Sequence, residues 1–297
     1  MTNASTHSLI TILGPTASGK TKLAVDLAKQ LSGEIISADS RQVYKNMDIG
    51  TGKDLNEYGQ TPYHLIDLVD PSAEYNLFNF ATDFNHAFKS ITQANHLPFL
   101  VGGTGMYLDA VLSRYKLTIA NIDENTRHEL EKKSEPELKA ILCKLKPALH
   151  NTTDIQSKHR LLQAIKIAMS ENNNAEAISW PLFKPLILGI QIERSRLKEK
   201  ITKRLKERLQ AGMIEEVIGL RTQAITDERI DNFGLEYRYI LKHLKGELNY
   251  NDMFQKLNAA IVNFTKQQNK WFRNLEKKGH EIIWLDSDSH MSEVALK

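Results

Sequence analysis

The chain has 297 residues, of which 41% are hydrophobic and 25% charged; these proportions are ordinary for a globular protein and exclude a disordered, collagen-like or fibrous chain. A net charge of +3 is too small to prove a polyanionic partner, and because neither a membrane-length apolar run nor a signal peptide is recognisable, we expect no membrane association. Cys143 is the only cysteine, so the chain can form no internal disulfide, and a cytoplasmic location is expected.

The first hundred residues alternate apolar runs with amphipathic stretches. Strands are expected at 9–13, 34–38 and 99–101, and helices at 20–31 and 78–94. A strand at 186–192, helices at 195–222, 235–245 and 250–277, and a last strand at 281–285 are expected further on. Such alternation is typical of an α/β fold in which helices flank a parallel sheet.

The sequence becomes helical and charged between these two parts. From Asp123, a plausible helix N-cap, to about Ser170 the pattern is that of helices interrupted at Pro136 and Pro147. We therefore expect a core made of residues 1–120 and 181–297, with an inserted helical subdomain at 121–180.

A phosphate-binding motif follows the first expected strand. The pattern G-x-x-x-x-G-K-[ST] is matched by Gly14, Pro15, Thr16, Ala17, Ser18, Gly19, Lys20 and Thr21. In this motif of ATP-binding and other nucleotide-binding proteins, backbone N–H groups and a helix N-terminus surround phosphate oxygens. Lys20 would neutralise phosphate charge and the Thr21 hydroxyl would bind Mg²⁺, so the sequence predicts a P-loop NTPase-like core.

Polar residues also follow the next strands, where ligands of open α/β sheets bind. Asp39 comes directly after one strand and is followed by Ser40, Arg41 and Gln42. Three roles are open for Asp39: a carboxylate in a magnesium shell, a general base, or a helix cap. Thr104, in the glycine-rich segment 102–105, follows another strand, whereas His64 is expected to have a structural role.

Two segments of the C-terminal half carry clustered basic groups. Seven Lys and Arg residues lie between 196 and 208, and among them Arg204 is suited to a bidentate diphosphate contact if it faces the P-loop. Segment 266–273 combines basic, amide and aromatic side chains, as RNA-binding surfaces do, although at least one of Trp271 and Phe272 is expected in the core.

Taken together and in this order, five segments resemble one family. They are GPTASGKT at 14–21, SADSRQVY at 37–44, DIGTGK at 48–53, HLID at 64–67 and GGTGMY at 102–107. The set is similar to the bacterial tRNA dimethylallyltransferases, also called isopentenyl-diphosphate:tRNA transferases. The resemblance continues through 203–205, 211–217 and 266–273 and covers most of the chain.

The resemblance implies transfer of a dimethylallyl group from dimethylallyl diphosphate to N6 of adenine 37 in tRNAs that read codons beginning with U. By analogy, the P-loop, Lys20 and Arg204 hold the diphosphate with Mg²⁺ on Thr21, and Asp39 is the general base. Thr104 resembles the family's residue beside the reacting adenine. Ser40, Arg41 and Gln42 correspond to the segment that contacts the flipped nucleotide.

The insert corresponds to the family's anticodon-loop subdomain, so the resemblance implies that the partner is the anticodon stem-loop of tRNA. The enzyme is expected to be a monomer. In this subdomain the family has the pattern Gln-Arg-x-x-Arg-Ala-Leu-Glu, and this chain has HRLLQAIK at 159–166. The positions expected to contact RNA are His159, Arg160 and Gln163. Gln163 and Lys166 depart from that pattern, as does Gln267 in the later Lys-Arg-Gln motif. Arg127 matches a further RNA contact.

Three other functions are compatible with parts of this pattern. A cytokinin-type isopentenyltransferase acts on free AMP or ADP, but a free nucleotide needs no insert of about 60 residues. A small-molecule P-loop kinase or ATPase would use Asp39 to bind magnesium. An RNA-binding module without turnover would be expected to have lost part of the chemical machinery, yet Lys20, Thr21 and Asp39 are all present.

Overall fold

The computed structural model describes residues 8–118, 123–145, 158–172, 177–287 and 295. They form two compact units, one made of Met1–Arg114 with Pro181–Lys297 and the other of Tyr115–Trp180. The expected insert at 121–180 falls within the second unit, which begins at Tyr115 instead. Within the described ranges, no helix has both the length and the apolar character needed to span a membrane.

The first unit is built around one sheet of six strands. In space their order is β3-β2-β4-β1-β5-β6, and every neighbouring pair is parallel. The strands are β1 (Leu9–Leu13), β2 (Gly33–Ser37), β3 (Tyr63–His64), β4 (Leu97–Gly102), β5 (Pro185–Gln191) and β6 (Ile283–Asp286). The expected α/β fold with a parallel sheet is therefore confirmed, with β1 at its centre between β4 and β5.

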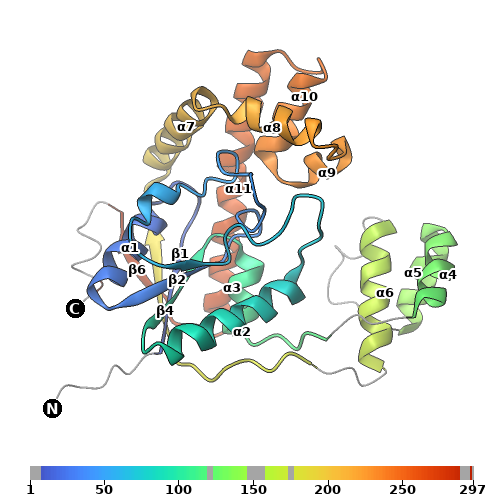
Figure 1. The fold of residues 1–297 in the computed structure, drawn as a ribbon, viewed down its shortest axis with the longest axis horizontal. Helices are drawn as coiled ribbons and strands as arrows, with labels where there is room; N and C mark the ends of the chain where they lie inside the picture. The colour runs from blue at the N-terminus through green and yellow to red at the C-terminus, as the bar shows by residue number, and fades with distance from the viewer. Residues whose placement is uncertain (1–7, 119–122, 146–157, 173–176, 288–294, 296–297) are drawn as a thin grey trace. The chain divides into compact units, whose positions relative to one another are not determined.

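Helices cover both faces of this sheet (Figure 1). Helix α1 (Lys20–Gln30) packs with Leu23 and Leu27 against alternate residues of the strands, including Ile12 and Phe99. The opposite face is covered by α2 (Leu77–Gln93) and α3 (Gly105–Leu112). Burial on both faces explains why the central strands are mostly apolar instead of alternating, with Thr11 a buried polar residue within β1.

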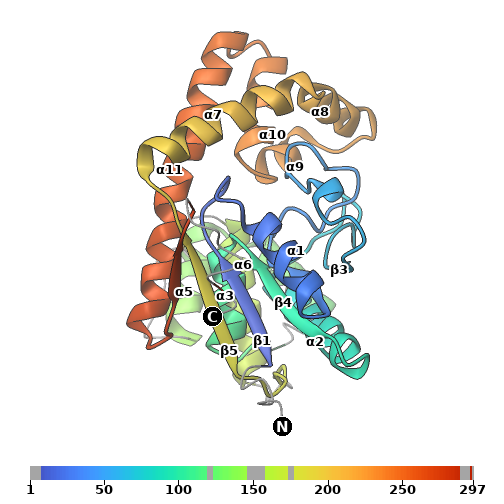
Figure 2. The same cartoon turned by 90° about the vertical axis from the view of Figure 1, so that its left-hand side faces the viewer.

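In the described part of the first unit, five further helices follow β5: α7 (Arg194–Gln210), α8 (Met213–Thr222), α9 (Asp227–Asn232), α10 (Leu235–Leu244) and α11 (Tyr250–Lys277). Helices α7 to α10 gather beyond the carboxyl ends of the strands, and α11 runs from this group back along the sheet (Figure 2). They share a second apolar core that includes Leu205, Val217, Phe233 and Leu257. The site described below forms between this helical group and the sheet.

The second unit contains α4 (Glu124–Lys132), α5 (Glu135–Leu145) and α6 (Lys158–Asn172). Asp123 caps α4 as expected, because its Oδ1 accepts the Thr126 N–H at 2.9 Å. Leu138, Leu142 and Leu161 form a small separate core. Pro136 lies in the first turn of α5, where a missing N–H costs nothing, and Pro147 is outside the described residues.

The expectation of one continuous helix over 195–222 was wrong. The chain forms α7 and α8, separated at Ala211 and Gly212, because Gly212 has a φ of 101°, which ends the right-handed helix. Sequence reasoning also missed strand β3, helix α3 and helix α9, as well as the short 3₁₀ helix η1 (Leu55–Glu57). Their brevity explains this, since two to eight residues carry little periodicity.

Gly212→Ala should lower the free energy of unfolding by about 1 kcal/mol or more, since a Cβ is disfavoured at this positive φ although space is available for it. Gly219→Ala is the matched control. It lies within α8, has open space around its Cα and should leave stability unchanged or raise it by up to about 1 kcal/mol. Equal destabilisation by both changes in urea titrations would contradict this explanation of the helix break.

Candidate active site

Three neighbouring strand ends build the floor of the site. The P-loop follows β1, Asp39 follows β2 after Ala38, and Thr104 follows β4. Thr104 ties two of these ends together, because its N–H donates to the Ala38 carbonyl at 3.2 Å and its Oγ1 accepts the Ser40 N–H at 3.1 Å. Only glycine fits at 102, since a Cβ there would lie 2.2 Å from the Ala38 carbonyl oxygen.

The P-loop has the local geometry that its sequence predicts. Gly19 adopts a φ of 92° just before α1, and Lys20 and Thr21 open that helix. The positive helix N-terminus therefore faces the cavity, with no acidic residue in the first turn to oppose an anion. Thr16, Ala17, Gly19, Lys20 and Thr21 line the cavity, whereas Gly14, Pro15 and Ser18 are buried.

The cavity has a volume of about 1140 Å³ and collects residues far apart in the sequence. Asp39, Ser40, Arg41, Gln42, Thr104 and Arg204 all line it together with the P-loop. The structure therefore brings together the four residues for which catalytic roles were predicted, namely Asp39, Thr104, Lys20 and Arg204. All of them belong to the first compact unit.

Lys20 is perturbed by this environment. Its Nζ donates to the Pro15 carbonyl at 2.8 Å. Burial and the nearby Arg204 cation lower the pKa of Lys20 to about 8, although the Asp39 carboxylate acts in the opposite direction. An incoming anion would stabilise the charged ammonium, so the site is prepared for negative charge.

Asp39 is held by a local turn. Its Oδ1 accepts the Arg41 N–H at 2.9 Å, and Oδ2 has no hydrogen-bond partner within the described part of the chain. No helix begins at this position, so the helix-cap alternative for Asp39 was wrong. One oxygen fixes the carboxylate and the other can accept a proton or contact a cation.

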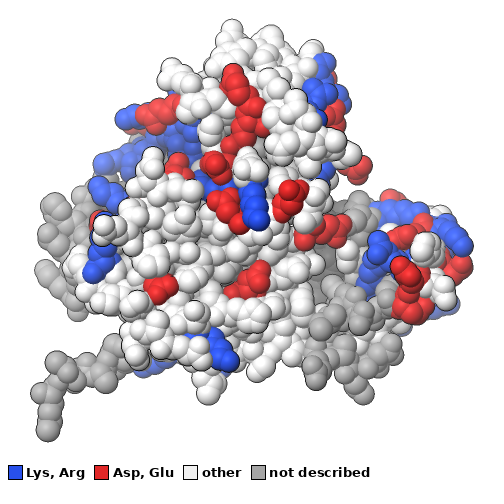
Figure 3. Space-filling view, in the orientation of Figure 1, with Lys and Arg blue, Asp and Glu red and all other residues white. Residues whose placement is uncertain are grey.

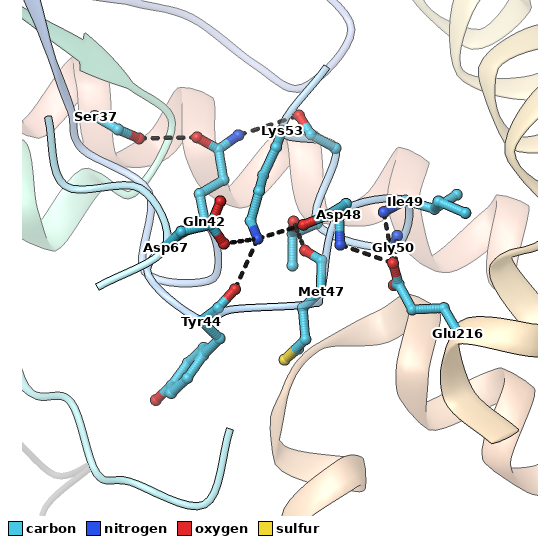
Figure 4. Close-up of polar contacts among 12 residues, drawn as sticks. Ser37, Gln42, Tyr44, Met47, Asp48, Ile49, Gly50, Lys53, Asp67 and Glu216 are labelled. Atoms are coloured by element: carbon cyan, nitrogen blue, oxygen red, sulfur yellow. Dashed lines mark hydrogen bonds and ion pairs between the residues drawn. The ribbon is translucent and has the colours of Figure 1, made fainter. Parts of the chain in front are cut away.

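Gln42 has a structural task that sequence reasoning missed (Figure 4). Its Oε1 accepts the Ser37 hydroxyl at 2.9 Å and its Nε2 donates to the Gly52 carbonyl at 3.1 Å. The side chain thus joins the end of β2 to the loop that contains Gly52. Its amide groups are already engaged within the protein.

A buried lysine holds the same loop (Figure 4). Lys53 is 1% exposed, and its Nζ contacts the Tyr44 carbonyl at 2.7 Å, Asp48 Oδ1 at 2.6 Å and the carboxylate of Asp67. Two carboxylates and a carbonyl satisfy the ammonium, which would otherwise be costly to bury. His64 is likewise structural, because its Nε2 pairs with Glu34 Oε2 at 2.6 Å.

Glu216 of α8 fixes the loop from its other side. Its carboxylate accepts the N–H groups of Asp48, Ile49 and Gly50 at 2.7, 2.7 and 3.0 Å. Charge-assisted bonds of this kind are stronger than neutral ones. The loop is therefore a fixed wall of the cavity.

Helix α11 is joined to the floor through Gln268. This side chain is 5% exposed; its Oε1 accepts the Thr16 N–H at 3.0 Å and its Nε2 donates to the Gly103 carbonyl at 2.9 Å. It was grouped with RNA-contacting residues from sequence, whereas the structure uses it to connect the P-loop with the end of β4. Of its neighbours, Phe272 is buried in the core and Trp271 is 38% exposed and lines the cavity.

Arg204 lies beside the P-loop, which meets the condition for the diphosphate contact expected from sequence. Its Nη1 donates to Thr16 Oγ1 at 3.3 Å and its Nη2 pairs with Asp54 Oδ2 at 2.6 Å. Three charged residues beside it were missed from sequence: Asp54, Arg208 and Glu236. For Arg208, the only signal in the sequence was that it is one of the seven basic residues between 196 and 208. Nothing in the sequence pattern indicated Asp54 or Glu236.

The RNA-contact residues expected in the insert belong to the second compact unit, which is described by itself. Arg127 is exposed and its Nε pairs with Glu131 Oε1 at 2.8 Å, while Gln163 is half-buried on α6. His159 and Arg160 also belong to α6, but their side chains lie outside the described part. Their contact with RNA stays a prediction.

Gln268→Leu should lower the free energy of unfolding by about 2 kcal/mol, because it leaves the half-buried Thr16 N–H and the buried Gly103 carbonyl without their partner. The matched control is Gln267→Leu, whose side chain is exposed and should change stability by no more than about 0.5 kcal/mol. Guanidinium titrations of both variants check this. Similar unfolding free energies for the two would remove Gln268 from this role.

The affinity for magnesium pyrophosphate should fall as pH rises through about 8, by up to about tenfold per pH unit, because Lys20 then loses its charge in the free protein. Calorimetric titrations between pH 7 and 9 check this. Lys20→Met should bind more weakly at pH 7 and lose this dependence. Lys22→Met, an exposed neighbour, should retain it; identical profiles for the wild type and Lys20→Met would contradict the assignment.

Comparison with known proteins places the chain in a family. The family model described as IPP transferase matches residues 42–275, and the model described as isopentenyl transferase matches residues 7–62. A tRNA dimethylallyltransferase 1 of Geotalea uraniireducens is 54% identical over 95% of this chain and 93% of its own length. A tRNA dimethylallyltransferase 2 of Trichlorobacter lovleyi is 52% identical over 96% and 94%.

A solved structure agrees with this relationship. The tRNA isopentenylpyrophosphate transferase of Bacillus halodurans superposes with a TM-score of 0.71 at 31% identity, covering 98% of this chain and 93% of that one. Fold and sequence therefore point to the same relatives over nearly the whole length. This chain belongs to the IPP transferase family, the family of the tRNA dimethylallyltransferases.

Proposed function

We propose that this chain transfers a dimethylallyl group from dimethylallyl diphosphate to the N6 amine of adenine 37 in tRNAs that read codons beginning with U. The observation that carries the proposal is that the P-loop, Asp39, Thr104 and Arg204 line one cavity. An anion site beside a carboxylate is what transfer from a diphosphate to an amine requires. The proposal also includes a monomeric enzyme, since the residues with proposed catalytic roles all belong to one compact unit of the chain.

The leaving group would bind at the P-loop. When the bond between the allylic carbon and oxygen breaks, the electron pair goes to the diphosphate, and the negative charge on that group grows. Lys20, Arg204 and the N-terminus of α1 offer positive charge at this place. Their stabilisation of the departing diphosphate would lower the barrier to bond cleavage.

The acceptor amine would approach from the side of Asp39. As N6 forms its bond to the allylic carbon it must lose a proton, and the free oxygen Oδ2 of Asp39 can accept it. Thr104 lies next to this segment, because its Oγ1 accepts the Ser40 N–H. A base held between these residues has to be flipped out of its stack, as for other enzymes that act on bases.

Apolar side chains supply the rest of the cavity wall. Met106, Phe264 and Trp271 all line it and are 42%, 41% and 38% exposed. Half-exposed apolar groups in a cavity suit an uncharged ligand portion such as a prenyl chain or a base. The cavity thus combines a cationic end with an apolar wall, as dimethylallyl diphosphate demands.

We propose Mg²⁺ as the cofactor. Within the described residues, no cluster of three His, Cys, Asp or Glu side chains could hold a metal ion by itself. This fits Mg²⁺, which commonly binds through few protein ligands together with substrate phosphates. The Thr21 hydroxyl lines the cavity and would hold the ion, which would neutralise charge on the diphosphate.

A tRNA substrate is supported by the names of the relatives and by surface charge. Lys and Arg gather over α7, and Lys200 and Lys203 of this helix line the cavity itself (Figure 3). Positive charge at a cavity rim favours a polyanion such as RNA. Free AMP is less well supported as the acceptor, because a reaction with a free nucleotide would give the unit Tyr115–Trp180 no function.

The test is incubation of the purified protein with Mg²⁺, labelled dimethylallyl diphosphate and either unmodified tRNA with an A36-A37-A38 run or free AMP, followed by nucleoside analysis. Label in adenine 37 supports the proposal. Label in AMP alone would reassign the chain to cytokinin-type chemistry. Label in neither, together with ATP turnover, would favour a kinase.

Asp39→Asn should reduce the single-turnover rate of prenylation by roughly 10²-fold, because the amide cannot accept the amine proton. Binding of dimethylallyl diphosphate should change little, since the amide oxygen can still accept the Arg41 N–H. Quenched-flow kinetics and calorimetry separate the two effects. An unchanged rate would show that Asp39 is not the base.

A further inference from the structure

Two guanidinium groups beside the P-loop share one carboxylate oxygen. Asp54 Oδ2 accepts from Arg204 Nη2 at 2.6 Å and from Arg208 Nη2 at 3.1 Å. The two arginines are one turn apart on α7 and therefore lie on the same helix face. An oxygen that receives two guanidinium groups has the surroundings of a phosphate oxygen in an anion site.

The loop is shaped around this pair. Gly52 has a φ of 67°, and a Cβ at this position would lie 1.8 Å from Arg208 Nη2 and 2.6 Å from Arg204 Nη2. Asp54 itself has a φ of 47°, which is uncommon for a residue other than glycine. Since Glu216 and Lys53 fix the loop backbone, the Asp54 side chain can move without the loop.

Arg208 is more deeply buried than the arginine of an ordinary surface ion pair. Its side chain is 13% exposed and lines the same cavity as Lys20. Burial, together with the Arg204 cation, lowers the pKa of Arg208. For Asp54, burial acts to raise the pKa, but Arg208 and Arg204 outweigh it and the pKa lies below its usual value, so this acid is ionised at neutral pH.

A second acid faces the same pair. Glu236, in the first turn of α10, lines the cavity with Arg204 and Arg208. Burial raises the pKa of Glu236, against the effect of the two arginines. Arg208 would therefore retain a nearby acidic group if Asp54 moved away.

We propose that Arg204 and Arg208 together form a two-guanidinium phosphate site, which Asp54 occupies until a diphosphate displaces it. Arg208 is then a second diphosphate-binding residue, and Asp54 is an internal competitor that sets the affinity for the substrate. The exchange is an exchange of anions: the guanidinium donors leave the carboxylate and bind phosphate oxygens. The identity of the ligand as dimethylallyl diphosphate rests on the proposed function; the anion site does not.

The test measures binding of inorganic pyrophosphate with Mg²⁺ by calorimetry, without tRNA or prenyl donor. Arg208→Gln should weaken binding by about tenfold or more, because one charge-assisted contact is lost. Asp54→Asn should strengthen it severalfold, because the competing charge is removed. Arg221→Gln and Asp227→Asn are matched controls from an exposed pair on α8 and α9, 3.0 Å apart, and should bind as the wild type does.

Two results would overturn the proposal. One is that Arg208→Gln binds pyrophosphate as tightly as the wild type does. The other is that Asp54→Asn binds it more weakly, which would show that Asp54 only orients the arginines. If Arg208→Gln does not fold by circular dichroism, Arg208→Lys replaces it and should lose part of the affinity. Failure of the proposed function is seen separately. It would appear as absent prenylation of tRNA by a wild-type protein whose pyrophosphate binding follows the pattern above.

Discussion

The close approach of the ends of β2 and β4 determines where the site forms. Gly102 lies against the Ala38 carbonyl at a distance that no Cβ permits, and Thr104 bonds to the same carbonyl. This contact places Asp39 and Thr104 side by side at the carboxyl edge of the sheet. Gln268 then connects the end of β4 to the neighbouring P-loop, so the Asp39 side and the P-loop side of the cavity share one floor.

Positive charge held in a cavity opposes folding and favours binding. Between pH 8 and 10.5 the folded chain carries a neutral Lys20 where the unfolded chain carries a charged one, so the folded state binds fewer protons and its stability rises with pH across this window. At neutral pH the charged Lys20 is therefore a cost to folding. A bound diphosphate would offset this cost, which links stability to ligand binding.

Much of the chemistry could be predicted from sequence because it lies at strand ends. The P-loop, Asp39 and Thr104 each directly follow an apolar run, and parallel strands bring their carboxyl ends together without any long-range information. Gln268 and Asp54 could not be found this way. Their partners are 252 and 150 residues away in the sequence, so only the packing of α11 and α7 against the loops gives them their roles.

The two family matches cover different parts of the proposed site. The isopentenyl transferase model ends at residue 62 and includes the P-loop, Asp39 and Asp54. The IPP transferase model runs from 42 to 275 and includes Tyr115–Trp180. The IPP transferase match begins after the P-loop and Asp39 but includes Thr104, Arg204 and Arg208, so neither match alone contains the whole proposed site. Gln163 and Lys166 belong to the second unit and are not among the residues that line the cavity, so their departure from the family pattern leaves every residue of the proposed anion site in place.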